Sequence, residues 1–169
     1  MISLATSNIT KQVKANVADV LKTGMLGGGK YIKSFEDKVA KFAGTKYAVS
    51  VSNGTMADII ALAVLKHLNP TKNEVIVPAL TFIAQTNSVL WNGLKLVFVD
   101  VGNDYQIDVK QVESKITENT LAIFAVHLLG KQCDLKGLRD LADKHSLFLI
   151  EDACEAFNYL PMVGEMKTF

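Results

Sequence analysis

The stretch GTMADIIALAVLKHLNPTKNEVIVPALTFIAQTNSVLWNGLKLVFVD, residues 54–100, alternates two kinds of segment. Longer segments have apolar residues at helical spacing, and short segments such as 74–77 and 95–99 are almost continuously apolar. Turn-forming residues, including Pro78 and Gly93, stand at the junctions. Strands that are apolar on both faces are typical of a parallel sheet with helices on both sides. The stretch therefore predicts an α/β fold with a mostly parallel sheet flanked by helices.

The same alternation extends in both directions along the chain. We predict strands at 47–51, 74–77, 95–99, 121–126 and 147–151, and helices at 54–68, 81–92, 108–116 and 134–145. The front of the chain predicts two further helices, one ending near Gly24 and one beginning at Ser34, with a glycine-rich loop between them. We therefore divide the chain into an N-terminal helical segment, residues 1–45, and a partial α/β domain, residues 46–169.

Composition argues against several classes of function. The 18 basic and 17 acidic residues nearly balance, and Arg139 is the only arginine, so we expect no binding to nucleic acid. Cys133 and Cys154 are too far apart for a metal motif, so we expect no metal. No apolar run approaches the ~20 residues that span a bilayer, and the first residues lack the pattern of a secretion signal. We expect a cytoplasmic protein without membrane contacts.

The turn SNGT, residues 52–55, leads directly from a predicted strand into a helix. Ligands of open α/β sheets bind at the carboxyl ends of the strands, which is where this turn lies. The backbone N–H groups of Thr55 and Met56 would suit a phosphate, and Gly54 would let the backbone come close. An ordinary helix cap and tight turn is the alternative interpretation.

Three other side chains follow predicted strands. Phe82 is either a core aromatic or a face for stacking on a planar ring. His127 ends a strand and could line a cleft. Asp152 follows Glu151 in a buried strand, so the two carboxylates point to opposite faces. A buried carboxylate needs a partner, and for Asp152 this is either a helix lysine or the protonated ring nitrogen of a cofactor.

Two nucleotide-binding motifs are incomplete. The segment GMLGGGKY, residues 24–31, has the spacing of a phosphate-binding P-loop, but Tyr31 replaces the Ser or Thr that would bind Mg²⁺. The glycine fingerprint of dinucleotide-binding domains does not follow any predicted strand, which disfavours a Rossmann-like domain.

An ordered set of motifs resembles a known family. The motifs are GxLGGGKYIxxFE at 24–36, AVSVSNGTMA at 48–57, VIVPALTFIA at 75–84, VFVDV at 97–101, AVHLLG at 125–130 and LIEDACEA at 149–156. They are similar to those of the pyridoxal-phosphate (PLP) nucleotide-sugar aminotransferases of the DegT/DnrJ/StrS type. The resemblance implies a partial large domain of a fold type I PLP-dependent transferase.

The resemblance also implies a cofactor site. Gly54, Thr55 and Met56 would bind the phosphate of PLP. Phe82 would stack on its pyridine ring, and Asp152 would pair with the protonated ring nitrogen. That pairing keeps the ring charged, so that the cofactor can act as an electron sink.

Some positions differ from the family pattern. Glu155 stands where many relatives carry Gln near the ring hydroxyl, and His127 remains a candidate for lining the substrate. The family's Schiff-base lysine comes after Asp152, farther along than this sequence runs, and Lys167 is a poor substitute. We therefore expect no catalytic residue in this chain and no activity of the chain alone.

The resemblance predicts the N-terminal part of an aminotransferase that acts on a nucleotide-linked keto sugar in polysaccharide or antigen biosynthesis. Glutamate is the expected amino donor, and the complete protein is expected to be a homodimer whose site is completed partly by front segments such as 24–36. Two alternatives stay open. One is a catalytically inactive remnant or interaction module, and the other is a sugar dehydratase, in which His replaces the lysine.

Overall fold

The structure is a computed structural model that describes residues 7–157. Contacts between residues divide the chain into two units, with the boundary between Ser50 and Val51. We call them the front unit and the sheet unit. The C-terminal residues, including Lys167, lie outside the described part of the chain.

The described part of the front unit contains two helices, α1 (Lys11–Thr23) and α2 (Lys30–Ala43). The hydroxyl of Tyr31 in α2 donates a hydrogen bond to Oδ2 of Asp19 in α1 at 3.0 Å. Ala40 is the one buried side chain of the two described helices. Between residues 7 and 50, therefore, the front unit has almost no core of its own.

Segment 47–51, which we predicted to be a strand, is not one. Its backbone pairs with no strand among the described residues, and Tyr47 and Val49 are 74% and 79% exposed. The backbone N–H and the hydroxyl of Ser50 both donate to a carboxylate oxygen of Glu36 at 2.9 Å. An alternating sequence forms a strand only where another strand supplies the hydrogen bonds.

The predicted start of the second helix is also wrong. Helix α2 begins before Ser34, and its N-cap is Gly29. The backbone φ of Gly29 is 89°, a value that glycine adopts easily and other residues rarely do. The run of glycines therefore allows the chain to turn into the helix early.

The sheet unit alternates helices and strands. In chain order, its described elements are α3 (Gly54–Leu68), β1 (Glu74–Pro78), α4 (Ile83–Trp91), β2 (Lys95–Val99), α5 (Val109–Val112), the 3-10 helix η1 (Glu113–Lys115), β3 (Thr120–Val126), the 3-10 helix η2 (Leu128–Gly130), α6 (Leu135–His145) and β4 (Phe148–Asp152). The helix predicted at 108–116 is thus divided into α5 and η1. None of the helices between residues 7 and 157 is long and apolar enough to cross a membrane.

The described strands form one parallel sheet, which confirms the predicted parallel arrangement, and their order is β2-β1-β3-β4. Pro78 of β1 lies opposite Val99 of β2, and Val126 of β3 lies opposite Asp152 of β4. Because all of these strands run in the same direction, their carboxyl ends lie at one edge of the sheet. The residues that follow the strands therefore gather at that edge.

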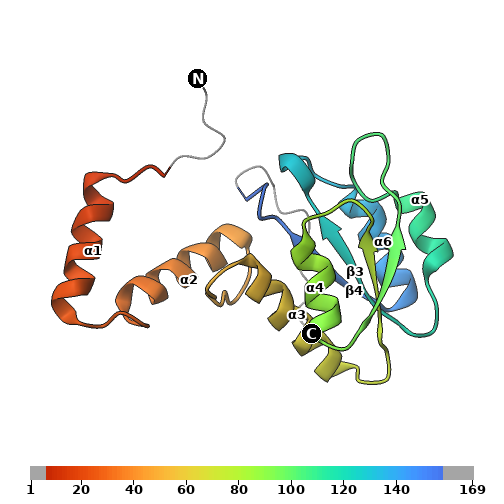
Figure 1. Ribbon diagram of the computed structural model, residues 1–169, viewed down its shortest axis with the longest axis horizontal. Helices are drawn as coiled ribbons and strands as arrows, with labels where there is room; N and C mark the ends of the chain where they lie inside the picture. Colours follow the sequence, from red (N-terminus) through yellow and green to blue (C-terminus); the bar gives the residue numbers. More distant parts are fainter. Residues whose placement is uncertain (1–6, 158–169) are drawn as a thin grey trace. The chain divides into compact units, whose positions relative to one another are not determined.

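Helices cover both faces of the sheet, with α3 and α4 on one face and α5 and α6 on the other (Figure 1). Strand β3 is buried along its whole length. Its Phe124 packs in the same core cluster as Leu62 of α3, and its Ile123 in the same cluster as Leu138 of α6. We call these two sides the α3 face and the α6 face.

Candidate functional site

A cavity of about 270 Å³ opens at the carboxyl edge of the sheet. Its lining comes from the first turns of α3 and α4 and from the residues at the ends of β3 and β4. It brings together all but one of the side chains that we predicted for a site: Gly54, Thr55, Phe82, His127, Asp152 and Glu155. It also contains polar side chains that we did not predict: Asp58, Gln85 and Cys154.

Asp152 is the last residue of β4, and its carboxylate is buried in the cavity wall. Oδ1 accepts a hydrogen bond from the backbone N–H of Cys154 at 2.9 Å, and Oδ2 accepts one from Nε2 of Gln85. The neighbouring Glu151 points to the other face, where its Oε2 lies 3.7 Å from Nε2 of His127. Strand alternation predicted this opposition. Between residues 7 and 157 no lysine or arginine forms an ion pair with Asp152, so the structure gives no support to a lysine partner.

Gln85 fixes the orientation of the Asp152 carboxylate from α4. It is 2% exposed, and its Oε1 accepts a hydrogen bond from the hydroxyl of Thr81 at 2.9 Å. Because one end of the amide is held by Thr81, the other end presents its N–H to Asp152. Sequence analysis missed Gln85 because a single Gln in a helix usually lies at the surface. The available signal was its spacing from the buried Ser88 and Val89 on the same side of α4.

Asp58 lies one turn into α3 and is only 7% exposed. Its Oδ2 has no hydrogen-bond partner within the described residues. Burial, and then the negative charge of Asp152, raise the pKa of Asp58 to about 7. Sequence analysis missed this residue too, although Gly54, Asp58 and Leu62 have the spacing of one buried stripe of a helix.

The first turn of α3 forms part of the cavity wall. The side chain of Asn53 caps the helix by accepting a hydrogen bond from the backbone N–H of Met56 at 3.0 Å. Met56, which we predicted to face a phosphate, is therefore already bonded, and its side chain lines a separate hollow. The N–H groups of Gly54 and Thr55 have no partner among the described residues. A Cβ atom on Gly54 would lie 2.7 Å from Sγ of Cys154, so only glycine lets this turn come so close to the end of β4.

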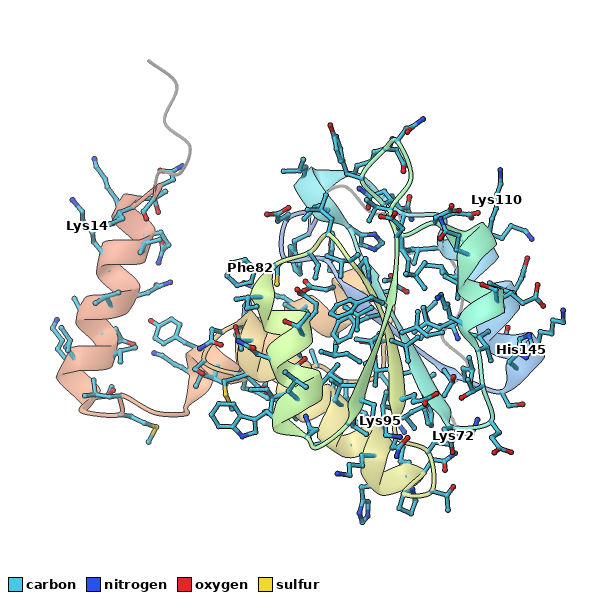
Figure 2. All side chains as sticks on the ribbon, turned by 45° about the vertical axis from the view of Figure 1, so that its right-hand side comes forward. Lys14, Lys72, Phe82, Lys95, Lys110 and His145 are labelled. Carbon is cyan, nitrogen blue, oxygen red and sulfur yellow. The ribbon has the colours of Figure 1, made fainter. Side chains whose placement is uncertain are left out.

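Phe82 stands at the rim of the cavity as the N-cap of α4 and is 66% exposed. Figure 2 shows it at the carboxyl edge of the sheet, whereas Lys72 and Lys95 lie at the opposite, amino edge. The exposed ring is thus available for stacking, and these two cations lie far from the cavity.

His127 and Glu155 contact the cavity but are held by other groups. Nδ1 of His127 accepts a hydrogen bond from the backbone N–H of Cys133 at 3.2 Å, so a neutral ring carries its proton on Nε2. Oε2 of Glu155 accepts a hydrogen bond from the backbone N–H of Leu129 at 2.5 Å. His127 is therefore oriented from the α6 face, and Glu155 fixes the turn after β3.

The chemistry of the cavity fits the cofactor that the resemblance implies. The lining contains three carboxylates (Asp58, Asp152 and Glu155) and neither lysine nor arginine, so it is suited to a cation. Two free N–H groups at the start of α3 are suited to an anion, and the Phe82 ring is suited to a planar group. PLP combines a ring nitrogen that takes up a proton, a planar ring and a phosphate. The described residues form no cluster that could hold a metal ion.

Comparison with known proteins connects the chain to one family. Residues 7–166 match the DegT/DnrJ/EryC1/StrS aminotransferase family. The chain is 39% identical to the GDP-perosamine synthase of Escherichia coli O157:H7, in an alignment that covers 96% of this chain and 46% of that protein.

Solved structures show the same fold. The structure of S. venezuelae DesV in complex with a ketimine intermediate matches with a TM-score of 0.78 and 34% identity, covering 88% of this chain and 40% of that one. A GDP-4-keto-6-deoxymannose-3-dehydratase with a trapped PLP-glutamate geminal diamine matches with a TM-score of 0.83 and 31% identity, covering 91% and 41%. The chain thus spans less than half the length of each of these relatives.

Proposed function

The chain belongs to the DegT/DnrJ/EryC1/StrS aminotransferase family, and on this premise we propose that it forms the N-terminal, cofactor-holding part of an enzyme that aminates a nucleotide-linked keto sugar. The structural matches confirm the predicted fold class, a partial large domain of a fold type I PLP-dependent transferase. Glutamate is the proposed amino donor. The proposed cofactor is PLP, and the Schiff-base lysine of the whole enzyme would lie outside this sequence.

The observation that carries this proposal is the environment of Asp152. Its carboxylate is buried, it is held by Gln85 and by the backbone of Cys154, and it lacks a cation among the described residues. Such a group is already oriented to accept a hydrogen bond from a cationic N–H. Bound PLP supplies an electron sink that stabilises negative charge on the substrate carbon when its proton leaves. The role of Asp152 is to hold the proton on the ring nitrogen.

The remaining residues would hold and orient the cofactor. The free N–H groups of Gly54 and Thr55 are assigned to the phosphate, and Phe82 is assigned to the ring face. Met56 follows Thr55 in the sequence and was predicted to bind the phosphate as well. Its N–H, however, already donates a hydrogen bond to the side chain of Asn53. Two residues complete the proposed site: Glu155 beside the ring hydroxyl and His127 on the substrate side.

Binding of pyridoxamine 5′-phosphate to the 169-residue chain tests the cofactor assignment. This form of the cofactor carries an amine instead of an aldehyde, so its binding does not require the lysine. We expect wild-type binding by fluorescence titration, and binding at least about tenfold weaker in Asp152→Asn because one opposite charge is lost. Asp140→Asn, the same change at an exposed α6 position, is the control. Absence of wild-type binding would overturn the assignment and favour the inactive remnant or interaction module.

A sugar dehydratase of the same fold is the second candidate, because a structural match is to a 3-dehydratase. The whole enzyme, incubated with a nucleotide-linked keto sugar and ¹⁵N-labelled glutamate, distinguishes the two. An aminotransferase leaves ¹⁵N on the sugar and converts glutamate to 2-oxoglutarate. A dehydratase releases water and leaves no ¹⁵N on the sugar.

The proposed partner of the whole protein is a second copy of the chain. Residues 21–30, which contain the glycine-rich loop of the front unit, are all exposed. Leu21, Met25 and Leu26 are apolar and 57% to 73% exposed, which is typical of a surface that binds another chain. Light scattering after size-exclusion chromatography should show oligomers at micromolar concentration. A clean monomer would contradict this part of the proposal.

A further inference from the structure

Helix α3 carries a carboxylate where its spacing places a core side chain. Gly54, Asp58 and Leu62 follow one another at four-residue intervals along the buried stripe. Gly54 touches the end of β4, and Leu62 is completely buried in the core of the α3 face. Asp58 lies between them and lines the cavity. It is one of the two buried residues of α3.

The other residues that line the cavity include no lysine or arginine that could pair with Asp58. From β4 and the turn after it come Asp152, Cys154 and Glu155, from the end of β3 comes His127, and from α4 comes the uncharged Gln85. Asp152 receives a hydrogen bond on each oxygen, whereas Oδ2 of Asp58 receives none within residues 7–157. Burial raises the pKa of the Cys154 thiol to about 12, so it carries no charge at neutral pH. Two carboxyl groups therefore share one buried site without a lysine or arginine in its lining.

We propose that Asp58 and Asp152 form a carboxyl pair that binds the protonated ring nitrogen of the cofactor, and that Asp58 releases a proton when the ring enters. This inference rests on the proposed function, and it adds a second acid to the one that the family resemblance assigns. In the ligand-free site, burial and the negative charge of Asp152 disfavour ionisation of Asp58, so Asp58 keeps its proton below about pH 7. When the cationic ring enters, its charge favours ionisation of both. The Asp58 proton then leaves to solvent, and the ring keeps its own N–H.

The proposal predicts a pH-dependent contribution of Asp58 to affinity. Below about pH 5 Asp58 carries a proton in the ligand-free site. At this pH the Asp58→Asn variant should bind pyridoxamine 5′-phosphate about as tightly as the wild-type chain does. At pH 8 the second carboxylate is charged and attracts the ring cation. The affinity of the wild-type chain should therefore exceed that of Asp58→Asn by roughly tenfold at pH 8.

Calorimetric titration of the 169-residue chain with pyridoxamine 5′-phosphate at pH 6.5 measures the released proton directly. Titrations in two buffers with different ionisation enthalpies give the number of protons released on binding. We expect Asp58→Asn to release about one proton fewer than wild type. Asp140→Asn, on the exposed side of α6, should match wild type. Comparison with these variants removes any contribution of the ligand's own phosphate.

A second ligand keeps the test valid if Asp58→Asn does not fold. An analogue of pyridoxamine 5′-phosphate with C–H in place of the ring nitrogen cannot present a cation. If the pair recognises the ring N–H, the wild-type chain should release about one proton fewer on binding this analogue than on binding pyridoxamine 5′-phosphate. Equal release with both ligands, or equal release by wild type and Asp58→Asn, overturns the carboxyl pair alone. Absence of binding by wild type overturns the cofactor assignment together with the pair.

Discussion

The two faces of the sheet differ in what they bury at the carboxyl edge. On the α6 face the apolar cluster includes Cys133, and the buried His127 lies beside Cys133 at the carboxyl edge, where its Nδ1 accepts a hydrogen bond from the backbone N–H of Cys133. On the α3 face the apolar cluster gives way to buried polar side chains at the carboxyl edge: Asp58, Gln85 and Asp152. Buried polar groups are unfavourable unless they are paired. The α3 face thus buries two carboxyl groups at this edge, and Oδ2 of Asp58 has no hydrogen-bond partner within residues 7–157.

The largest effect should come from the α6 face. Leu138→Ala removes a fully buried side chain from the apolar cluster and should lower the free energy of unfolding by about 3 kcal/mol. Urea denaturation measures this loss. The affinity of the folded variant for pyridoxamine 5′-phosphate should not change. If the free energy of binding became weaker by as much as the free energy of unfolding fell, the two faces would not be separate in function.

Asp152→Asn is the corresponding change on the α3 face. In the whole enzyme it should lower turnover by about 100-fold, because an amide cannot hold the proton on the ring nitrogen. The free energy of unfolding should change little, since the amide relieves the like charge next to Asp58 while it weakens one hydrogen bond. Steady-state kinetics and urea denaturation measure the two effects. Equal turnover in mutant and wild type would make Asp152 a structural residue only.

Asp58→Leu should extend the buried apolar cluster of the α3 face toward the carboxyl edge and so raise the stability of the chain. The pKa of Asp58 in the folded chain, about 7, lies above its ordinary value of 3.8. The folded state therefore binds the proton more tightly, and this stabilisation is complete below pH 4 and is lost as the pH rises through 7. We expect the Leu variant to exceed wild type in stability by about 2 kcal/mol at pH 8. Urea denaturation at pH 4 and pH 8 tests this, and an equal difference at both pH values would contradict it.

Gly54→Ala should have the smallest effect. The added methyl group would lie 2.7 Å from Sγ of Cys154, so α3 or the end of β4 must shift, at a loss of about 1 kcal/mol in stability. Cys154→Ala in the same chain should restore most of the loss. Thermal unfolding of the single and double variants measures the coupling. Equal losses in both backgrounds would show that the contact between α3 and β4 does not require glycine.

The sequence predicted most of the sheet unit because its signals are local. The run 54–68 reads as a helix, and the structure has α3 at the same residues. Segment 47–51 has the pattern of a strand, but its partner cannot be read from that pattern, and none exists in the described chain. The positions of Phe82 and Asp152 followed from the rule that ligands bind at the carboxyl ends of strands.

The parts of the site that were missed depend on contacts across the fold. Asp58 is an isolated acid in a helix and would ordinarily lie in solvent. Its burial depends on the approach of α3 to β4, which Gly54 and Cys154 set. Gln85 likewise acquires its role only because β4 brings Asp152 next to α4. Periodicity describes one element at a time, so it cannot show that two acids from different elements share one site.

The outer position of β4 has a consequence for the rigidity of the site. In the described chain β4 pairs with β3 alone, whereas β1 and β3 each have a neighbour on both sides. The backbone amide hydrogens of an outer strand exchange with solvent when that strand opens locally. Those of inner strands exchange only through larger unfolding events. Because Asp152 is the last residue of β4, local opening of this strand would displace its carboxylate. A segment or second chain that paired with the free side of β4 would slow amide exchange there and would narrow the range of positions of the carboxylate.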